Sequence, residues 1–322
     1  MIARLKTRLS ALDRRRRWEL VGAVLLLAAF AIRSGQFGNP LIHVDENFYL
    51  LVGDRMLHGA LPYVDIWDRK PVGLFLLFAA IRLLGGDGIV QYQVVATLCA
   101  AATAFVIARM AAPMAGLKAA TVACVVYLLL LGLVGGTGGQ AQVFYNLLVA
   151  GAAWATLIVS TRPGVSPGQI RRHGLIATGL IGLAMQIKYT AVFEGVFLGV
   201  SLMWAFWRCS EWLSHLAIDT ALWIGLALAP TLAALARYAC LGHTEAFLYA
   251  NFLSIGDRSG ASPDELLYRL SKAWKALHIP LFAVVLAAVL EPWRRFTAGP
   301  ATFGFALIWP AAAVGGYLVF GT

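Results

Sequence analysis

The chain has 322 residues, of which 60% are hydrophobic and only 13% are charged. Soluble proteins carry roughly 45–50% apolar and about 25% charged residues, so this composition excludes an ordinary soluble domain and indicates a protein that faces lipid. The formal net charge is +10, but the basic residues do not spread over one face of a soluble domain. We therefore expect membrane lipids as partners and no nucleic acid.

The N-terminal segment 1–17 carries seven basic residues, including the run Arg14 to Arg17, directly before apolar residues 18–36. This is the positive-inside pattern, which predicts a basic N-terminus in the cytoplasm followed by a membrane span. A signal peptide with Leu20 to Ile32 as its apolar core is the alternative. The small-x-small triplet at Ala29 to Ala31 lies inside that core instead of after it, which favours an uncleaved first helix.

Apolar blocks continue along the rest of the chain. A helix needs about 20 residues to cross the hydrocarbon core, so we predict an all-α polytopic membrane protein with about nine crossings. The predicted crossings are 18–36, 90–111, 117–135, 143–161, 174–187, 190–207, 214–238, 276–292 and 300–320.

The apolar segment 71–86 is too short and too polar to count as a crossing. It follows Lys70 and contains Arg82. If this segment lies along the membrane or dips into it, the short basic loops all fall on the cytoplasmic side. The outside then contains a first periplasmic loop at 37–89, a second loop at 136–142, the junction at Lys188 and a later loop at 239–275. Because the outside loops carry the unusual polar residues, we expect any site to be extracytoplasmic.

The first outside loop begins with an amphipathic pattern. Its apolar positions recur at helical spacing, which predicts an interfacial helix that ends near His58, with Asp45 and Glu46 in its first turn. A purely structural alternative makes Asp45 an N-cap and lets Glu46 complement the helix dipole. In the same alternative, Lys70 reaches the lipid headgroups.

The order of residues in this loop resembles a known family. The residues that carry the resemblance are Asp45-Glu46, Tyr49, Gly59, Pro62-Tyr63, Asp65, Trp67-Asp68 and Lys70-Pro71. They are similar to the first periplasmic loop of GT-C glycosyltransferases, above all the dolichyl-phosphate-mannose protein mannosyltransferase superfamily. That superfamily includes bacterial aminoarabinose and lipopolysaccharide-core sugar transferases. The resemblance is weaker at Gly139 to Phe144 and at Gly182 to Lys188. Family members often carry an acidic residue where Gln142 stands, which speaks against a catalytic or metal role for the second loop.

The resemblance implies a fold, a reaction and a location. Residues 18–322 would form a GT-C transmembrane module in a bacterial inner membrane, with its active site facing the periplasm. The module would transfer a sugar from a polyprenyl-phosphate donor, with inversion, to a hydroxyl of an acceptor lipid, glycan or protein. Asp45 stands at the family's catalytic aspartate, with Glu46 beside it. Members usually exceed 322 residues, which leaves open that a C-terminal part is missing.

Such a transfer needs one base to take the proton of the attacking hydroxyl, a role that suits Asp45. The leaving lipid phosphate is already an anion, so cations can stabilise it in place of an acid. The predicted donor-phosphate-binding residues are Arg69, Lys70, Lys188 and Arg258, and the predicted substrate-binding residues are Tyr49 and Tyr63. A divalent cation could bind the loop carboxylates, but no ligand spacing specifies a metal and no other cofactor is predicted.

A membrane transporter or lipid flippase is the main alternative. Lys188 interrupts an apolar stretch, and Asp219 lies inside the apolar block 214–238, positions where an ionised group is unfavourable and often functional. A structural reading pairs Lys188 with Glu194. Transporters often concentrate such residues near the bilayer midplane in matching halves. Here the carboxylates gather in one outside loop, which favours an enzyme.

Overall fold

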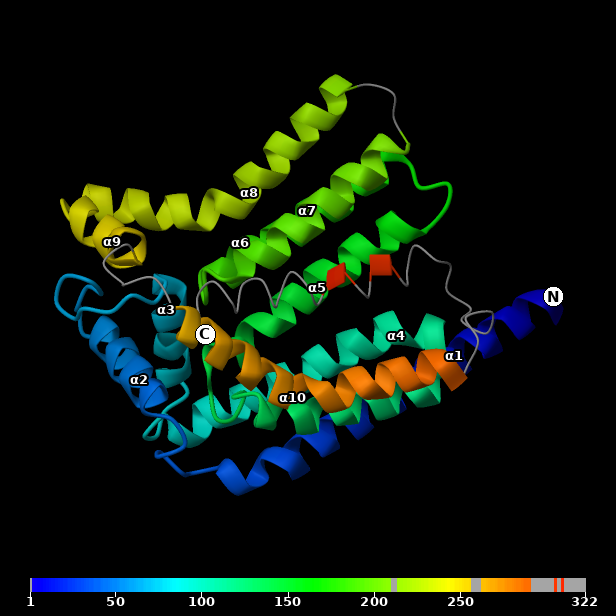
Figure 1. The fold of residues 1–322 in the computed structure, drawn as a ribbon, viewed down its shortest axis with the longest axis horizontal. Coiled ribbons are helices and arrows are strands. Elements are labelled where there is room, and N and C mark those ends of the chain that lie inside the picture. Colours follow the sequence, from blue (N-terminus) through cyan, green and yellow to red (C-terminus); the bar gives the residue numbers. More distant parts are fainter. Residues whose placement is uncertain (1, 210–212, 256–261, 291–303, 306–307, 310–322) are drawn as a thin grey trace.

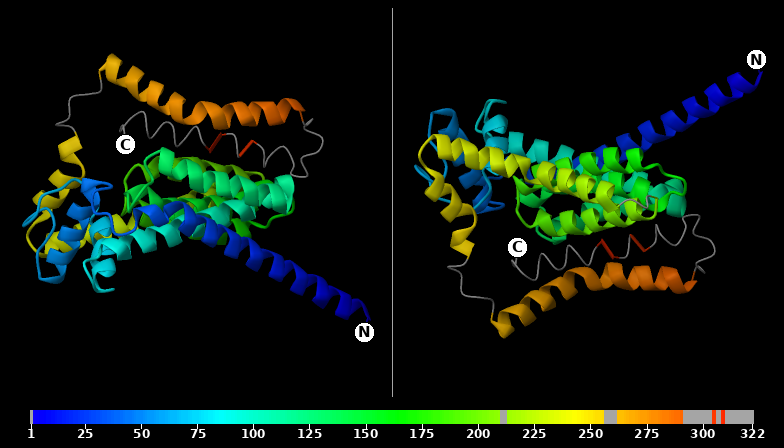
Figure 2. Two further views of the ribbon diagram at one scale, coloured as in Figure 1. Left: turned by 90° about the horizontal axis from the view of Figure 1, so that it is seen from below. Right: turned by 90° about the horizontal axis from the view of Figure 1, so that it is seen from above.

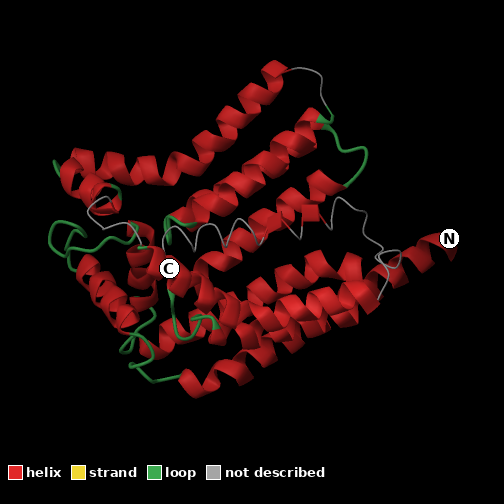
Figure 3. Ribbon diagram, viewed as in Figure 1, coloured by secondary structure: helices red, strands yellow, loops and turns green. Residues whose placement is uncertain are grey.

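The computed structural model describes all residues except 1, 210–212, 256–261, 291–303, 306–307 and 310–322. In the described part the chain is built from helices and connecting loops, and no β-strand occurs there (Figure 3). The helices are α1 (Ile2–Arg33), η1 (Ser34–Gln36), α2 (Val44–Leu57), α3 (Val72–Arg82), α4 (Ile89–Leu133), α5 (Ala141–Thr161), α6 (Pro167–Met185), α7 (Ala191–Trp207), α8 (Leu213–Cys240), α9 (Thr244–Asn251), η2 (Leu253–Ile255) and α10 (Pro263–Leu290). The prediction of an all-helical membrane protein is confirmed at this level.

Helix α4 is two helical segments joined at a sharp break. Gly116 has φ 80° and ψ 162°, a non-helical conformation that glycine adopts easily because it has no Cβ. The side chains of Thr103 and Tyr127, from opposite sides of the break, lie close enough to interact, so the second segment folds back along the first. The two predicted crossings 90–111 and 117–135 therefore both lie within α4.

Within the described residues, four helical segments are long and apolar enough to cross a membrane. They are Asp13–Gln36, Ile89–Leu133, Ala141–Thr161 and Ser214–Cys240. The predicted number of crossings is larger because α4 contains two of them and because α6 and α7 are shorter or less apolar than these four. The predicted crossing 276–292 falls largely in α10, and most of 300–320 lies outside the described residues.

Helix α3 has 11 residues. At 1.5 Å per residue it spans roughly 16 Å, about half of a hydrocarbon core, so it is too short to cross. The later loop predicted at 239–275 contains α9, η2 and the first turns of α10.

The connections between helices gather at two ends of the bundle (Figures 1 and 2). Helices α2, α3 and α9 lie together at one end, whereas the start of α1 and the connection from α5 to α6 lie toward the other (Figure 1). At this second end the Arg109 guanidinium lies 4.6 Å from the ring centroid of Trp18 and 5.3 Å from that of Trp154. One end of the bundle is thus basic, and the other end carries the first loop. The distribution of basic residues in the sequence predicted this separation.

The buried carboxylate of Asp219 has a partner on a neighbouring helix. Arg171 of α6 donates a charge-assisted hydrogen bond from Nε to Asp219 Oδ1 on α8. Trp223 Nε1, one turn further along α8, donates to the carbonyl oxygen of Arg171 at 3.3 Å. Because Asp219 is completely buried, this pair removes the main cost of placing its charge inside the protein. The pair ties α6 to α8.

The Arg171–Asp219 pair makes a testable prediction about stability. Arg171→Met leaves the buried carboxylate without its cation, so we expect a loss of about 1–3 kcal/mol in the free energy of unfolding. Arg172→Met is the matched control, because Arg172 is exposed on the same helix and forms no ion pair among the described residues. Thermal melts in detergent should show destabilisation in Arg171→Met alone, and equal melting temperatures in the two variants would contradict the assignment.

Candidate active site

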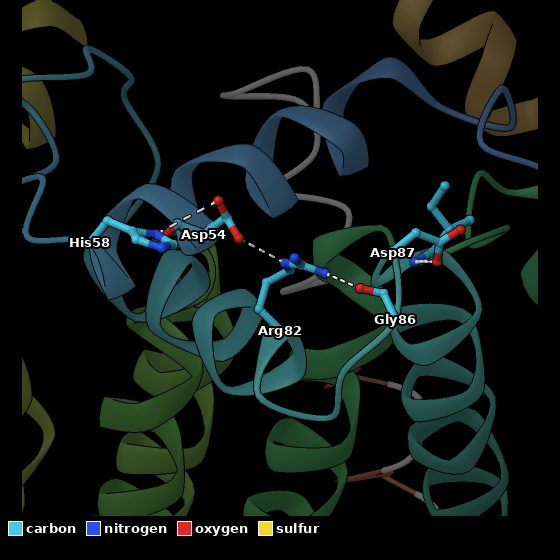
Figure 4. Close-up of polar contacts among 6 residues, drawn as sticks. Asp54, His58, Arg82, Gly86 and Asp87 are labelled. Carbon is cyan, nitrogen blue, oxygen red and sulfur yellow. Dashed lines mark hydrogen bonds and ion pairs between the residues drawn. The ribbon is translucent and has the colours of Figure 1, made fainter.

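The first loop folds as two short helices that pack on each other. Gly53 of α2 touches the α3 backbone, since a Cβ built at Gly53 would lie 2.6 Å from the amide nitrogen of Ala79. Arg82 at the end of α3 forms an ion pair with Asp54, with Nε 3.1 Å from Oδ1, and donates from Nη1 to the carbonyl oxygen of Gly86 at 2.8 Å (Figure 4). His58 Nδ1 lies 2.8 Å from the carbonyl oxygen of Asp54. The Gly53 and Arg82 contacts hold α2, which carries Asp45, against α3.

Asp45 lies in the first turn of α2, as predicted, and its side chain is exposed. The hydroxyl of Tyr49, one turn further along, donates to Asp45 Oδ2 at 3.4 Å. The Tyr49 ring is only 2% exposed and packs edge-on against Phe75 and Phe78 of α3. The N-cap of α2 is His43, so the N-cap alternative for Asp45 is wrong. Asp45 is an accessible carboxylate held by a rigid tyrosine.

A second carboxylate, Asp68, lies close enough to Asp45 for the two charges to interact. Asp68 is half-buried and accepts a hydrogen bond from the backbone amide of Arg69. Burial raises the pKa of Asp68, Asp45 raises it further, and the Arg69 amide and the Lys70 ammonium act in the opposite direction. In the sequence, Asp68 stands out only as part of the Trp67-Asp68 motif. Its position beside Asp45 depends on the turn at 58–71, which residue spacing did not reveal.

Two of the predicted phosphate-binding lysines come together from distant parts of the chain. Lys70 ends the turn before α3, and Lys188 lies in the connection between α6 and α7. Burial lowers the pKa of Lys188 to about 8, the like charge of Lys70 lowers it as well, and Glu194 acts in the opposite direction. The charges of Glu194 and Lys188 interact, but among the described residues the two side chains do not form the ion pair that the structural alternative predicted. The ammonium groups of Lys188 and Lys70 lie close enough for their charges to interact, so this end of the junction is suited to bind an anion.

A glycine explains how α3 comes so close to the end of α6. A Cβ built at Gly73 would lie 2.5 Å from Cβ of Gln186 and 2.7 Å from its carbonyl oxygen. Because no side chain fits in this space, Gly73 lets the two backbones touch immediately beside Lys70 and Lys188. The side-chain amide of Gln186 is directed elsewhere and donates to Thr231 of α8 at 2.7 Å.

The other two predicted cations are not part of this cluster. Arg69 is exposed, and its guanidinium carbon lies 5.7 Å from the ring centroid of Trp67. Arg258 lies outside the described residues.

Tyr63, one of the two predicted substrate-binding residues, is buried in the structure. Only 5% of Tyr63 is exposed, and its hydroxyl lies 2.7 Å from the carbonyl oxygen of Lys70 and 3.3 Å from Asn251 Oδ1. Tyr189 donates to the same Asn251 oxygen at 2.9 Å, and Tyr238 donates to the carbonyl oxygen of Pro62 at 2.8 Å. We call Tyr63, Tyr189 and Tyr238, together with Asn251, the aromatic latch. It connects the turn at 58–71 to α8, α9 and the Lys188 junction. Tyr49 is also buried and supports Asp45 instead of lining a binding surface.

The backbone of Tyr63 is unusual. Its φ is 69°, and it is the one non-glycine residue with positive φ in the described part of the chain. A bulky residue in this region is strained and persists only where the surroundings hold it in place. Here the aromatic latch supplies that support, which shows that the turn carrying Asp68 and Lys70 is held in a defined conformation.

Glu46, predicted beside Asp45 as a second catalytic residue, is fully buried against the second loop. Gln140 Nε2 lies 3.4 Å from Glu46 Oε1, and a Cβ built at Gly138 would lie 2.4 Å from both carboxylate oxygens. Burial raises the pKa of Glu46. A residue so enclosed does not reach an incoming substrate. Glu46 therefore positions the second loop, and Asp45 alone of the adjacent pair is open to the outside.

Arg33 at the end of α1 completes this second cluster and was not predicted. It is 3% exposed and donates to Thr97 Oγ1 at 3.2 Å, to the carbonyl oxygen of Gly136 at 2.7 Å and to that of Gly138. Its charge also interacts with that of Glu46. In sequence Arg33 resembles a residue that marks the end of a membrane span. Nothing in the local pattern indicates that it is buried.

The second loop carries the amide side chains of Gln140 and Gln142. Gln142 Nε2 donates to the carbonyl oxygen of Gly135 at 2.7 Å and so closes the loop. Within the described residues, no three side chains of His, Cys, Asp or Glu are grouped in a way that could hold a metal ion. The residues that come together at the site are two carboxylates and two lysines.

Comparisons with known proteins do not identify a relative: no protein family, no curated protein and no solved structure matches this chain.

The contact at Gly73 can be tested with a matched pair of glycine substitutions. Gly73→Ala places a methyl group against Gln186, so we expect a loss of about 1–3 kcal/mol in the free energy of unfolding despite the higher helix propensity of alanine. Gly199→Ala in α7 is the control, because nothing lies within 4 Å of a Cβ built there. Thermal melts should show Gly73→Ala as the less stable variant. A Gly73→Ala protein as stable as Gly199→Ala would mean that α3 and α6 are not in backbone contact.

Proposed function

We propose that the chain is a membrane glycosyltransferase that moves a sugar from a polyprenyl-phosphate donor to an acceptor hydroxyl, with inversion. The observation that carries the proposal is the series of interacting charges Asp45, Asp68, Lys70 and Lys188. One end of the series is an open carboxylate, and the other is a partly desolvated pair of ammonium groups. A base and an anion-binding pair are the two elements that this reaction requires.

In the proposed reaction the acceptor oxygen attacks the anomeric carbon of the donor sugar. The bond from the acceptor oxygen to this carbon forms as the bond from the carbon to the phosphate oxygen breaks, and the electron pair leaves with the phosphate. Asp45 takes the proton of the attacking hydroxyl. Tyr49 holds the Asp45 carboxylate in place while leaving it exposed. Asp68 lies two residues before Lys70, and its charge interacts with those of Lys70 and Asp45.

Lys70 and Lys188 would hold the donor phosphate and stabilise the second negative charge that it gains as the leaving group. Two ammonium groups that repel each other in the free protein attract an anion more strongly once it lies between them. This arrangement favours the phosphate in its more charged, departing form. No general acid is then needed, in contrast to glycosidases, whose leaving group must be protonated.

A groove beside the lysines fits the apolar part of such a donor. It has a volume of about 790 Å³ and is lined mainly by apolar residues of α2, α3, α6 and α8, among them Gly73, Leu183, Ile187, Pro230 and Ala233. Ile187 adjoins Lys188 in sequence, so an isoprenoid chain in this groove would place its phosphate toward the lysine pair.

The transport alternative rested on Lys188 and Asp219. Asp219 is neutralised by Arg171, and Lys188 lies at a helix junction beside the first loop. Neither arrangement favours an ion pathway through the bundle over the proposed transfer reaction.

Asp45→Asn tests the proposed base. The change removes the base and almost no volume, so we expect sugar transfer to fall by about 10²–10⁴-fold, as measured with radiolabelled polyprenyl-phosphate sugars and mixed acceptors in membranes. Asp87→Asn is the control, since Asp87 is exposed in the same loop and its carboxylate only accepts from the amide of Ile89. Equal transfer by wild type and Asp45→Asn would remove Asp45 from the mechanism.

The pKa of Lys188 predicts a pH dependence. With a pKa of about 8, Lys188 is charged at lower pH and loses its charge as the pH rises through this value. The kcat/KM for the donor should therefore fall above about pH 8. Lys188→Arg keeps the charge to much higher pH and should remove this alkaline fall. A fall at the same pH in both proteins would show that another group is responsible.

A further inference from the structure

The basic end of the molecule, opposite the proposed active site, contains two adjoining grooves. Each groove has a volume of about 710 Å³, and both are lined by Arg14, Trp18 and Arg109. The first groove runs along α1 and α4 over apolar residues that include Leu26, Leu98 and Phe105. The second continues between α4 and α5 to Arg162.

Arg109 is fixed between the two grooves. Its guanidinium carbon lies 4.6 Å from the ring centroid of Trp18 on α1 and 5.3 Å from that of Trp154 on α5. Contacts of a cation with two aromatic faces hold the side chain without neutralising its charge. These ring contacts use none of the N–H donors of Arg109, so the donors are available to an anion.

The arginines around Arg109 differ in whether a carboxylate neutralises them. Arg17 pairs with Asp13, with Nη2 2.7 Å from Oδ2. Arg14, Arg109 and Arg162 form no ion pair among the described residues. Three uncompensated cations therefore line the grooves, and each groove has an apolar floor.

We propose that these grooves bind one anionic phospholipid of the adjacent leaflet, with two phosphate groups held by Arg14, Arg109 and Arg162. The lipid's acyl chains lie in the two grooves on either side of the Trp18–Arg109 contact. Basic pockets between membrane helices are suited to phosphate-bearing headgroups of this kind. A free phosphate would leave the apolar floors empty, whereas a lipid fills both the polar and the apolar part. This site is independent of the proposed transfer reaction.

Native mass spectrometry of the purified full chain in neutral detergent tests the site. The probes are cardiolipin, which has two phosphates, phosphatidylglycerol, which has one, and zwitterionic phosphatidylcholine. We expect cardiolipin to bind most tightly and phosphatidylcholine least. Arg109→Gln should weaken cardiolipin binding by roughly five- to tenfold, the effect of losing one arginine near a phosphate. Arg172→Gln is the matched control, because it removes the same charge from an exposed position on α6, outside both grooves.

A second variant protects the test if Arg109→Gln does not fold. Arg14→Gln/Arg162→Gln changes two exposed side chains and should reduce cardiolipin binding at least as strongly. Cardiolipin binding that Arg172→Gln retains and these variants lose supports the proposal. Binding of phosphatidylglycerol or phosphatidylcholine as tight as that of cardiolipin would overturn it. Equal cardiolipin binding by the groove variants and the control would overturn it as well.

Discussion

The backbone contact between α3 and α6 at Gly73 controls the geometry of the candidate site. Lys70 lies just before α3, separated from it only by Pro71, and Lys188 lies shortly after the end of α6. The distance between the two lysines therefore depends on how closely these helices approach each other. A side chain at position 73 would collide with Gln186. The repulsion between two nearby ammonium groups must be offset by the packing that brings them together. The aromatic latch around Tyr63 and Asn251 supplies part of that packing.

Two clusters of charged residues lie at the end of the molecule that carries the first loop, and they differ in their exposure to solvent. The cluster of Arg33 and Glu46 is closed to solvent and joins α1, α2 and the second loop. The cluster of Asp45, Asp68, Lys70 and Lys188 is more open and is the one that we assign to chemistry. Adjacent residues thus serve different purposes, because Asp45 and Glu46 leave the helix in different directions. Burial, rather than residue type, separates the enclosed carboxylate of Glu46 from the exposed one of Asp45, to which we assign the proposed chemistry.

Local patterns predicted the helical elements well. The spacing of apolar residues predicted α2 with Asp45 and Glu46 in its first turn, and the polar ends of segment 71–86 predicted a helix too short to cross. The break at Gly116 matches the boundary between two predicted apolar blocks. These features depend on periodicity over a few turns, which a single sequence contains.

The features that a single sequence did not predict all depend on contacts between distant segments. Asp68 gains its position beside Asp45 through the turn that Tyr63 holds. Arg33 is recognisable as buried only once the carbonyl groups of residues 136–138 are placed around it. Tyr49 and Tyr63 have the polar hydroxyl of a binding residue, but their rings are packed in the core. Residue type indicates what a side chain can do, whereas packing decides whether a substrate reaches it.

The titration of Lys188 tests most directly whether the distant lysines share one site. Its pKa can be followed in the full chain by competitive acetylation across a pH series, read by mass spectrometry. The account predicts a pKa of about 8 in the wild type and a higher value in Lys70→Met, because the variant removes a like charge. Lys118→Met, an exposed lysine at the basic end, should leave the value unchanged. A Lys188 pKa near the ordinary 10.5, or one that Lys70→Met does not raise, would contradict the site.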